Sequence, residues 1–431
     1  MKKLLVFIFL FLPIFLFARE SDVFIGLSSK YNPNSLPKIG LGANTYTENT
    51  PEEEKKYSNL FAEVLRSDLY RSRYFNIEET VPAAETSALS PQLSLLRKEG
   101  MLYFVFFDFS DTSTQDVWEI KAFMYDTNSK NALLAKKFVV PTKSIRKSAH
   151  MFADQIVKLI TGKRGLASTK IAFANDYTGR KEIYIVDYDG YNLTKLTSDK
   201  SISLLPRWGN NGTKLYYTTY RNGNPQIYVV DLKEGEISPV VKGKGLNLIG
   251  GVSNDSKKLV MTLSRGENPS VYLKELSTGR TLQLTDKYGV DGSPSFSPDG
   301  KFVTFVSNRS GNPQIYIMNL ETKETRRLTK FNWTDSPQWS PNGDWIAFAG
   351  RRAADHPIDI FLIDITGGQI RQLTADSGSN EDPWWSPDGR FLAFTTNRSG
   401  KRQIYVMDAD GSAQHLVANI KGNSFTPSWS D

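Results

Sequence analysis

The sequence predicts a multi-domain protein, with a small N-terminal α/β domain followed by a six-bladed all-β propeller that is closed by the C-terminal strand. Three observations predict this organisation. The chain has 431 residues, about three times the length of a typical domain. One motif recurs at nearly constant spacing through residues 206–431, which indicates a repeat architecture. The residues before the repeats instead show the periodicity of amphipathic helices and alternating strands.

The composition removes several classes of protein and site. The chain contains no Cys, which excludes disulfide scaffolds, Cys-ligated zinc, iron–sulfur clusters, thiol nucleophiles and a lipid-modified N-terminal Cys. Its three His residues are scattered, so a His-built zinc site is not expected. Apolar residues make up 39% of the chain and charged residues 23%, as in ordinary folded proteins. The 12% of aromatic residues, with 31 Gly and 20 Pro, favours short strands and tight turns.

The N-terminus has the three-part pattern of a secretory signal. Lys2 and Lys3 precede an apolar run of 14 residues, 4–17, and Ala18 supplies a small residue for cleavage. The alternative is an uncleaved anchor, but the run is shorter than the roughly 20 residues that span a bilayer. We therefore expect an exported, soluble protein in the periplasm that does not span the membrane. Without Lys2 and Lys3 the net charge falls from +7 to +5, and no basic stripe suggests nucleic-acid binding.

The repeated unit has the length and strand pattern of a propeller blade. Residues 294–300 read Pro-Ser-Phe-Ser-Pro-Asp-Gly, and related strings return 43 to 46 residues apart. In each unit, strand A ends in Trp/Phe-Ser, the Pro-Asp-Gly turn follows, and strands B, C and D come next, as at 302–306, 315–318 and 325–329. Four strands in about 44 residues is the period of a blade. The six copies begin at Pro206, Gly250, Pro294, Pro337, Pro383 and Pro427.

Counting strands predicts how the ring closes. The first set of strands B, C and D begins near Ile171 and has no strand A before it, whereas the last strand A, 425–430, has no strands after it. Pairing these two orphans completes a sixth blade from both ends of the chain and removes a free sheet edge.

Residues 37–162 predict a small α/β domain. Lys38–Leu41 and 101–107 are strand candidates, and 117–125 with 133–140 form a predicted hairpin. Helices are expected over Glu52–Leu69 and Ser144–Ile160, with Gly162 as the stop signal of the second. The predicted divisions are a signal peptide at 1–18, a partner-binding segment at 19–36, the α/β domain at 37–162, a linker at 163–169 and the propeller at 170–431.

The combination of these features resembles the TolB family, the periplasmic component of the Tol–Pal envelope system. Its most specific part is the junction, where Leu159-Ile-Thr-Gly-Lys-Arg-Gly165 leads into Thr169–Phe173 and then into Asp187-Tyr-Asp-Gly-Tyr-Asn192. The Trp-Ser-Pro-Asp-Gly repeats are less specific, because propellers attached to peptidases also carry them. The resemblance implies a non-enzymatic adaptor without a cofactor, which supports outer-membrane integrity and envelope constriction at cell division.

The resemblance also implies two partners. The lipoprotein Pal would bind one mouth of the propeller, and the inner-membrane-anchored TolA would bind the N-terminal segment, roughly 20–29. Other outer-membrane proteins are further candidates, and we expect the protein itself to be a monomer. For the N-terminal segment, the alternative is that it forms an ordinary first strand of the α/β domain. The residues of this segment that are predicted to contact TolA are Glu20, Asp22, Val23, Phe24, Ile25 and Leu27.

Loop positions predict which residues face Pal. The D-to-A loops and B-to-C hairpins share one mouth, opposite the Pro-Asp-Gly turns. Acidic and amide groups are expected near the channel and arginines farther out, as a patterned docking surface, unless they pair across blades to hold the ring. The inner residues are Asn247, Asp291, Asp335, Glu381 and Asp382, and the outer residues are Arg221, Arg265, Arg309 and Arg398. The aspartates of the Pro-Asp-Gly turns and the repeated Trp residues are expected to be structural.

Three further hypotheses concern the same mouth. Asp291, Asp335 and Asp382 come from consecutive blades and could hold Ca²⁺ if they converge. Asp335, Glu381 and Asp382 could include the acid and base of a polysaccharide lyase or glycosidase. Trp333 and Trp384 could serve a glycan-binding module. A propeller-fronted serine peptidase is not expected, because the chain contains no G-x-S-x-G string.

Overall fold

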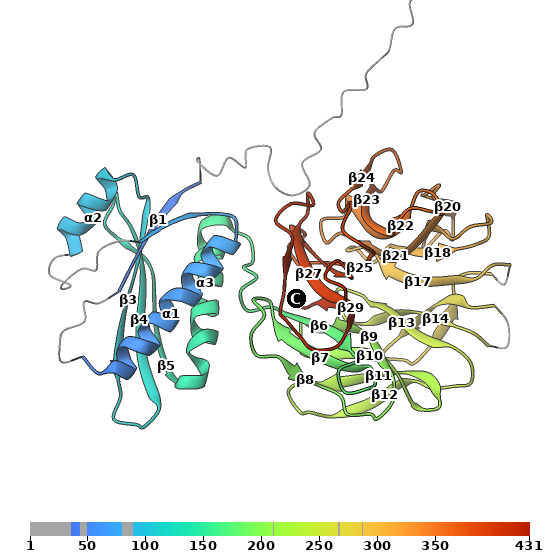
Figure 1. Cartoon of the computed structure of the whole chain (residues 1–431), viewed down its shortest axis with the longest axis horizontal. Coiled ribbons are helices and arrows are strands. Elements are labelled where there is room, and N and C mark those ends of the chain that lie inside the picture. Colours follow the sequence, from blue (N-terminus) through green and yellow to red (C-terminus); the bar gives the residue numbers. More distant parts are fainter. Residues whose placement is uncertain (1–35, 44–49, 80–88, 210, 266–267, 287) are drawn as a thin grey trace, which may run out of the picture.

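Two units of structure follow one another along the chain (Figure 1). The computed structural model describes residues 36–43, 50–79, 89–209, 211–265, 268–286 and 288–431. The predicted signal peptide and the segment predicted to bind TolA therefore lie outside the described residues. Among the helices that are described, none is long and apolar enough to cross a membrane.

The first unit is a five-stranded mixed sheet with helices on both faces. The strand order is β2-β1-β3-β4-β5, with β1 parallel to both β2 and β3 and the remaining neighbours antiparallel. The strands are β1 Lys38–Ala43, β2 Asn76–Glu79, β3 Tyr103–Asp111, β4 Val117–Asp126 and β5 Ala132–Pro141. The helices are α1 Glu52–Arg71, α2 Leu89–Lys98 and α3 Ile145–Thr161.

Alternation along the central strand β3 explains the two layers of helix. Val105 and Phe107 belong to the large core under α1 and α3, whereas Phe104 and Phe106 pack with α2 on the other face. Successive side chains of a strand point to opposite faces, so one apolar strand serves both cores. Gly162 ends α3 with φ of 71°, a left-handed conformation that glycine adopts without steric cost, as the sequence predicted.

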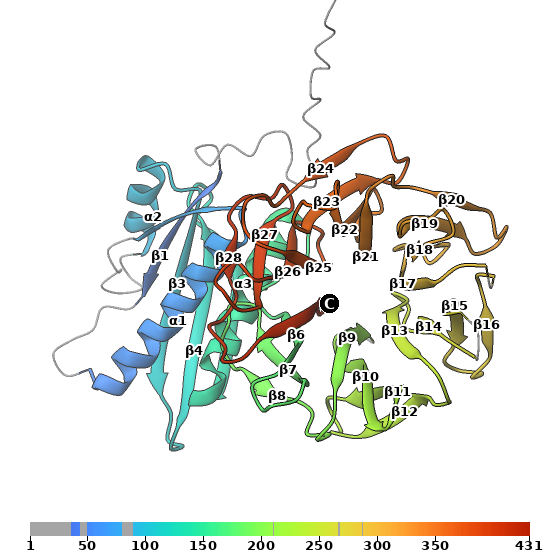
Figure 2. The ribbon, with the colours of Figure 1, turned by 45° about the vertical axis from the view of Figure 1, so that its right-hand side comes forward.

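The second unit consists of six four-stranded sheets arranged around an axis, and Figure 2 shows the C-terminus close to that axis. Blade 1 combines β29 Ser424–Trp429 with β6 Lys170–Asn175, β7 Glu182–Asp187 and β8 Thr194–Lys195. Blade 2 has β9 Ser203–Gly209, β10 Lys214–Asn222, β11 Asn224–Asp231 and β12 Ile237–Val241. Blade 3 has β13 Asn247–Val252, β14 Lys258–Leu263, β15 Ser270–Glu275 and β16 Thr281–Gln283.

The last three blades repeat the same plan. Blade 4 has β17 Asp291–Phe296, β18 Phe302–Ser307, β19 Gln314–Asn319 and β20 Thr325–Arg327. Blade 5 has β21 Trp333–Trp339, β22 Trp345–Arg351, β23 Asp359–Asp364 and β24 Ile370–Gln372. Blade 6 has β25 Asn380–Trp385, β26 Phe391–Thr396, β27 Gln403–Asp408 and β28 His415–Leu416.

The predicted closure of the ring is confirmed. Strand β29 pairs antiparallel with β6, so that Trp429 lies opposite Ile171 across some 258 residues of sequence. At the end of this seam, the amide of Ser430 donates to the carbonyl of Lys170 at 2.8 Å. The indole of Trp429 donates to Thr169 Oγ1, also at 2.8 Å. The first and last strands of the propeller segment are therefore built into one sheet.

The repeated motif is structural, as predicted. In the turn after β17, Ser297 Oγ donates to Asp299 Oδ1 at 2.6 Å, and the same oxygen accepts the amide of Lys301 at 3.1 Å. Gly300 follows with φ of 68°. Between blades, the Trp385 indole of blade 6 donates to the carbonyl of Gln338 in blade 5 at 3.1 Å.

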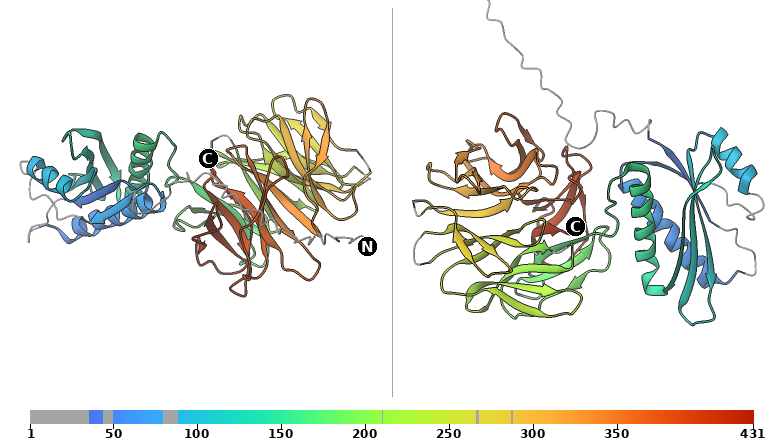
Figure 3. Two further views of the ribbon diagram at one scale, coloured as in Figure 1. Left: turned by 90° about the horizontal axis from the view of Figure 1, so that it is seen from above. Right: turned by 180° about the vertical axis from the view of Figure 1, so that it is seen from behind.

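The α/β unit lies at the side of the propeller, against blade 6 and against blade 1, in which β29 pairs with β6 (Figure 3). Arg390 of blade 6 donates from Nη1 to the carbonyl of Ser72 at 2.5 Å and lies 4.0 Å from the ring centre of Tyr74. Arg73 forms an ion pair with Asp408 of the same blade at 3.4 Å.

We expect removal of residues 424–431 to open the ring, because β6 would lose its partner and two blade cores would face water. The truncated protein should lose its cooperative thermal transition or fail to stay soluble. The single substitution Trp429→Ala should lower the free energy of unfolding by about 3–5 kcal/mol. Thermal melting followed by circular dichroism measures both. Removal of Asp431 alone leaves β29 intact and is the control, so equal losses for the two truncations would contradict this role of β29.

Candidate partner-binding mouth of the propeller

The loops from strand D to strand A and the hairpins from strand B to strand C form one mouth of the channel, here called the loop mouth. A small cavity of about 60 Å³ lies on the axis below it. All six blades contribute to its lining through strand A. The contributing residues include Leu205, Leu248, Ser293, Ser336, Asp382 and Thr426.

A strained backbone repeats around this cavity. The residue immediately before the anchor Pro has φ between 49° and 55° in five blades, although none of these residues is glycine. Each marks a break in register between strands A and B. Such a conformation costs on the order of 1–3 kcal/mol per residue and persists only where the surrounding structure holds it. The five residues are Leu205, Ser293, Ser336, Asp382 and Thr426.

Asp382 lines the axial cavity and Asp335 lines a neighbouring groove, and hydrogen bonds between blades hold both side chains. Ser293 Oγ of blade 4 donates to Asp335 Oδ1 of blade 5 at 2.7 Å, and Ser336 Oγ donates to Asp382 Oδ1 of blade 6 at 3.1 Å. Burial raises the pKa of Asp335. Burial, reinforced by the charges of Glu381 and Asp335, raises the pKa of Asp382 to about 6.

Arg207 is a buried cation of the channel that the sequence analysis did not identify. Its Nε donates to the carbonyl of Gly250 at 2.7 Å, and its guanidinium lies 4.5 Å from the ring centre of Trp384. Burial lowers its pKa to about 10, and the nearby charge of Asp382 opposes this effect. Arg207 occupies the variable position of the Pro-x-Trp motif, where other blades carry Gly, Ser, Gln or Trp. A positive charge at a repeat position that is uncharged in the other blades was the sequence signal that could have identified Arg207.

Asn247 and Asp291 are placed differently from Asp335 and Asp382. Both are fully buried at the start of strand A, and each binds an arginine from the B-to-C hairpin of its own blade. Arg309 lies 3.0 Å from Asp291 Oδ2, and Arg265 donates to Asn247 Oδ1 at 3.0 Å. The arginines therefore pair within blades, whereas the sequence analysis considered pairing across blades.

Arg398 follows the same pattern and donates to Asn380 Oδ1 at 3.2 Å. Arg221 instead pairs with Asp199, in the loop between β8 and β9. Glu381 is partly exposed and pairs with Arg402 at 2.9 Å.

The structure does not bring Asp291 together with Asp335 and Asp382. Across the described ranges, the His, Asp and Glu atoms that lie within 4.8 Å of one another in a group of three belong to Asp68, His150 and Asp189, at the domain interface. The predicted Ca²⁺ site thus lacks a converging set of carboxylates in this structure.

The loop mouth also carries an apolar arc, of which the sequence analysis named only Trp333. Four residues before the anchor, consecutive blades 2 to 5 carry an apolar side chain: Ile202, Leu246, Val290 and Trp333. Ile202 and Val290 are 40% and 45% exposed. Val290 and Trp333 line a groove of about 260 Å³ that reaches Asp335. The sequence signal was the recurrence of an apolar residue four positions before the anchor. These residues form an arc only in the folded ring, where the blades lie side by side.

The opposite mouth, formed by the Ser-Pro-Asp-Gly turns, has a larger cavity of about 310 Å³. Five indoles and the last residue of the chain contribute to its lining. These residues are Trp208, Trp339, Trp384, Trp385, Trp429 and Asp431. Burial raises the pKa of the Asp431 side chain.

We expect Arg309→Ala to destabilise the protein by about 3 kcal/mol, because it leaves the buried carboxylate of Asp291 without its cation. Asp291→Asn should cost less, because Asn247 and Asn380 already accept the equivalent arginine in their blades. Urea unfolding of the two variants measures the difference. Equal losses would show that the charge of Asp291 is not the reason that Arg309 stabilises the blade.

Comparison with known proteins agrees with this architecture. A family model described as the TolB beta propeller domain matches residues 157–358 and 330–431. The Tol-Pal system protein TolB of Geobacter sulfurreducens is 36% identical over 154 residues, which is 35% of each chain. TolB of Desulfosudis oleivorans is 31% identical over 206 residues, 47% of this chain and 46% of its own. These matches therefore span less than half of the curated relatives.

A solved structure extends the likeness to both units. The crystal structure of TolB from Acinetobacter baumannii superposes with a TM-score of 0.76 and 27% identity, covering 92% of this chain and 97% of the other. This likeness includes the α/β unit, over which the sequence resemblance rested on pattern alone. The chain belongs to the TolB family of β-propeller proteins of the Tol–Pal system.

Proposed function

We propose that the protein is a non-enzymatic periplasmic adaptor of the Tol–Pal system, which binds Pal through the loop mouth and TolA through residues 20–29. In this role it supports outer-membrane integrity and envelope constriction at cell division. The observation that carries the Pal part of the proposal is the apolar arc beside the acidic channel entrance. Partly exposed apolar side chains next to a groove and charged groups are the composition of a protein-docking surface.

The state of the carboxylates favours an adaptor over a lyase or glycosidase. An acid and a base for glycoside chemistry need two carboxyl groups that face a substrate. Asp335 and Asp382 accept hydroxyl donors from neighbouring blades, and Glu381 is neutralised by Arg402. These contacts give each carboxylate a structural partner, which supports a stabilising role. Turnover of an envelope polysaccharide by the pure protein would overturn this part of the proposal.

We expect Val290→Asp to weaken binding of the soluble domain of Pal at least tenfold, because it places a charge in the groove between Val290 and Trp333. A tenfold loss corresponds to about 1.4 kcal/mol. Isothermal titration calorimetry with the mature protein measures the affinity. Val139, which is 56% exposed on β5, provides the matched control Val139→Asp. Equal affinities for the two variants would place the Pal site elsewhere, with the opposite mouth as the next candidate.

We expect deletion of residues 20–29 to abolish capture of TolA while the affinity for Pal and the melting temperature stay within error. Val23–Leu27 is an alternating apolar stretch, which is able to add as a strand to the edge of a partner sheet. Pull-down of purified TolA by the parent protein and by the deletion variant measures capture. A large loss of thermal stability in the deletion variant would instead support the alternative, in which this segment is the first strand of the α/β domain.

A further inference from the structure

A buried histidine lies where the α/β unit meets the first blade. His150 of α3 is 4% exposed, and its Nδ1 lies 2.7 Å from Asp68 Oδ2 of α1. Its other ring nitrogen, Nε2, is buried without a hydrogen-bond partner and lies 3.6 Å from Asp189 Oδ2. Each nitrogen of the ring therefore faces a carboxylate oxygen, one from each unit of the protein.

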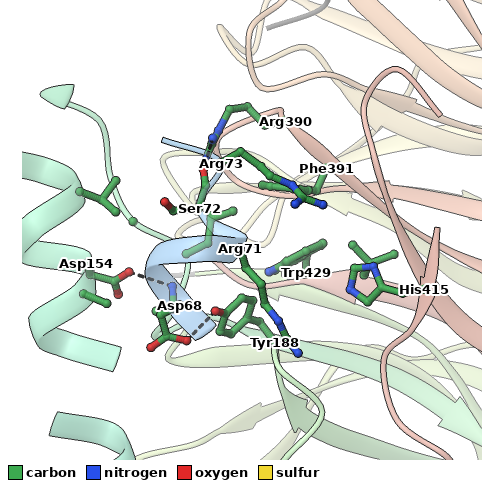
Figure 4. A pocket seen from close by; sticks show the side chains of 16 residues that line it. Asp68, Arg71, Ser72, Arg73, Asp154, Tyr188, Arg390, Phe391, His415 and Trp429 are labelled. Atoms are coloured by element: carbon green, nitrogen blue, oxygen red, sulfur yellow. Dashed lines mark hydrogen bonds between the residues drawn. The ribbon is translucent and has the colours of Figure 1, made fainter. Parts of the chain in front are cut away.

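The blade side of this contact comes from a motif to which the proposed adaptor function assigns no role. The turn Asp187-Tyr-Asp-Gly-Tyr-Asn192 supplies both Tyr188 and Asp189. Tyr188 donates its hydroxyl to Asp68 Oδ1 at 2.6 Å, and Figure 4 shows this bond reaching across the interface. Arg146 of α3 pairs with Asp189, and its guanidinium lies 3.7 Å from the ring centre of Tyr191.

The charges around His150 balance only when the ring carries a proton. The carboxylates are Asp68, Asp154 and Asp189, from α1, α3 and the blade turn, and the permanent cations are Arg71 and Arg146. Asp154 also accepts the amides of Ala167 and Ser168 from the linker, at 2.8 and 2.9 Å. When all three carboxylates are ionised, three negative charges face two positive charges, and an imidazolium cancels the excess.

Hydrogen bonding favours the same protonation state. A neutral imidazole carries one N–H, so it can donate to Asp68 but then presents a lone pair to Asp189. An imidazolium has donors on both nitrogens and attracts both carboxylates. The contact between His150 and the blade is thus attractive in one protonation state and repulsive in the other.

We infer that His150 is a proton-dependent latch that fixes the α/β unit against blade 1. The contacts with blade 6, made by Arg390 and Arg73, involve permanent guanidinium charges and do not need this proton. When the ring loses its proton, blade 1 keeps the Tyr188–Asp68 hydrogen bond and the Arg146–Asp189 ion pair but loses the attraction of His150 for Asp189. The α/β unit is then held less tightly at blade 1 than at blade 6 and can pivot about the blade 6 contact.

The direction of the pH dependence follows from the environment of the ring. Burial lowers the pKa of His150, but the hydrogen bond and charge of Asp68 and the charge of Asp189 outweigh this effect and raise the pKa above 6.5. Burial also raises the pKa of Asp68. A raised folded-state pKa means that the latch is complete below about pH 6.5 and weakens as the pH rises through the folded-state pKa.

The first test is the titration of the ring itself. The chain has only three His, so the ring signals of His150, His356 and His415 can be assigned by substitution in a ¹⁵N-histidine-labelled protein. We expect His150 to titrate with a midpoint above pH 6.5 and to show both ring nitrogens protonated below it. A midpoint at or below 6.5 would overturn the inference. A saturable change of the His150 signal on adding Zn²⁺ at pH 7 would also overturn it, in favour of a metal site.

The second test follows the arrangement of the two units. Because the chain has no Cys, Asn128→Cys and Glu321→Cys introduce the only thiols, one on each unit, for a pair of spin labels. We expect one distance distribution at pH 5.5 and a second population that grows towards pH 8.5. His150→Gln should show the second population at every pH, whereas the exposed control His356→Gln should titrate like the parent. An unchanged distribution in the parent, or titration of His150→Gln like the parent, would contradict the latch. Neither readout involves Pal or TolA, so a failure here leaves the proposed adaptor function standing.

Discussion

Each blade of the propeller shares its hydrophobic core with the blade on either side. Six apolar clusters lie between adjacent blades, and each draws residues from two sheets. Between blades 4 and 5, for example, Ile315 and Phe331 pack against Phe348 and Phe361. A linear row of such sheets would leave half a core open at each end. Closure of the ring is the arrangement that buries every cluster, and it depends on β29 reaching β6.

This closure also creates the surfaces on which the proposed function depends. Since strand A of every blade lines the axis, one repeat position becomes a ring around the channel. The bulge before the anchor Pro and the hydrogen bonds from Ser293 and Ser336 then fix Asp335 and Asp382 at the channel wall. The apolar arc arises in the same way, because residues about 44 positions apart in sequence become neighbours on one mouth. The proposed docking surface thus needs no special loop and arises from small changes in a repeated unit.

The α/β unit is joined to the ring at its closing blades. Its contacts are made with blade 6 through Arg390 and Arg73 and with blade 1 through Asp68, His150 and Tyr188. The linker is held as well, because the amides of Ala167 and Ser168 donate to Asp154. Blade 1 therefore contains the seam of the propeller and also forms part of the domain interface. The protonation state of a few buried groups at this interface can affect how the two units are oriented.

The sequence by itself determined the repeat, the number of blades, their closure by the chain ends and most elements of the α/β unit. It could do so because periodicity and turn chemistry are local: Pro-Asp-Gly specifies a turn and alternating apolar residues specify a strand wherever they occur. The short polar strand β2 was not predicted, because nothing in its own four residues indicates that it pairs with β1. Helix α2 was missed because it begins with Leu-Ser-Pro, although Pro is tolerated in a first helical turn.

Only the tertiary structure decided what the charged residues of the site do. Asp291, Asp335 and Asp382 look alike in the sequence, but they occupy three different positions relative to the anchor Pro of their blades. One is buried against Arg309, and the other two each accept a hydrogen bond from a serine of the preceding blade. Asp68, His150 and Asp189 are separated by up to 121 positions, and no spacing rule connects them. Charge, burial and hydrogen bonding act through space, so partners are defined only once the blades and the α/β unit are packed together.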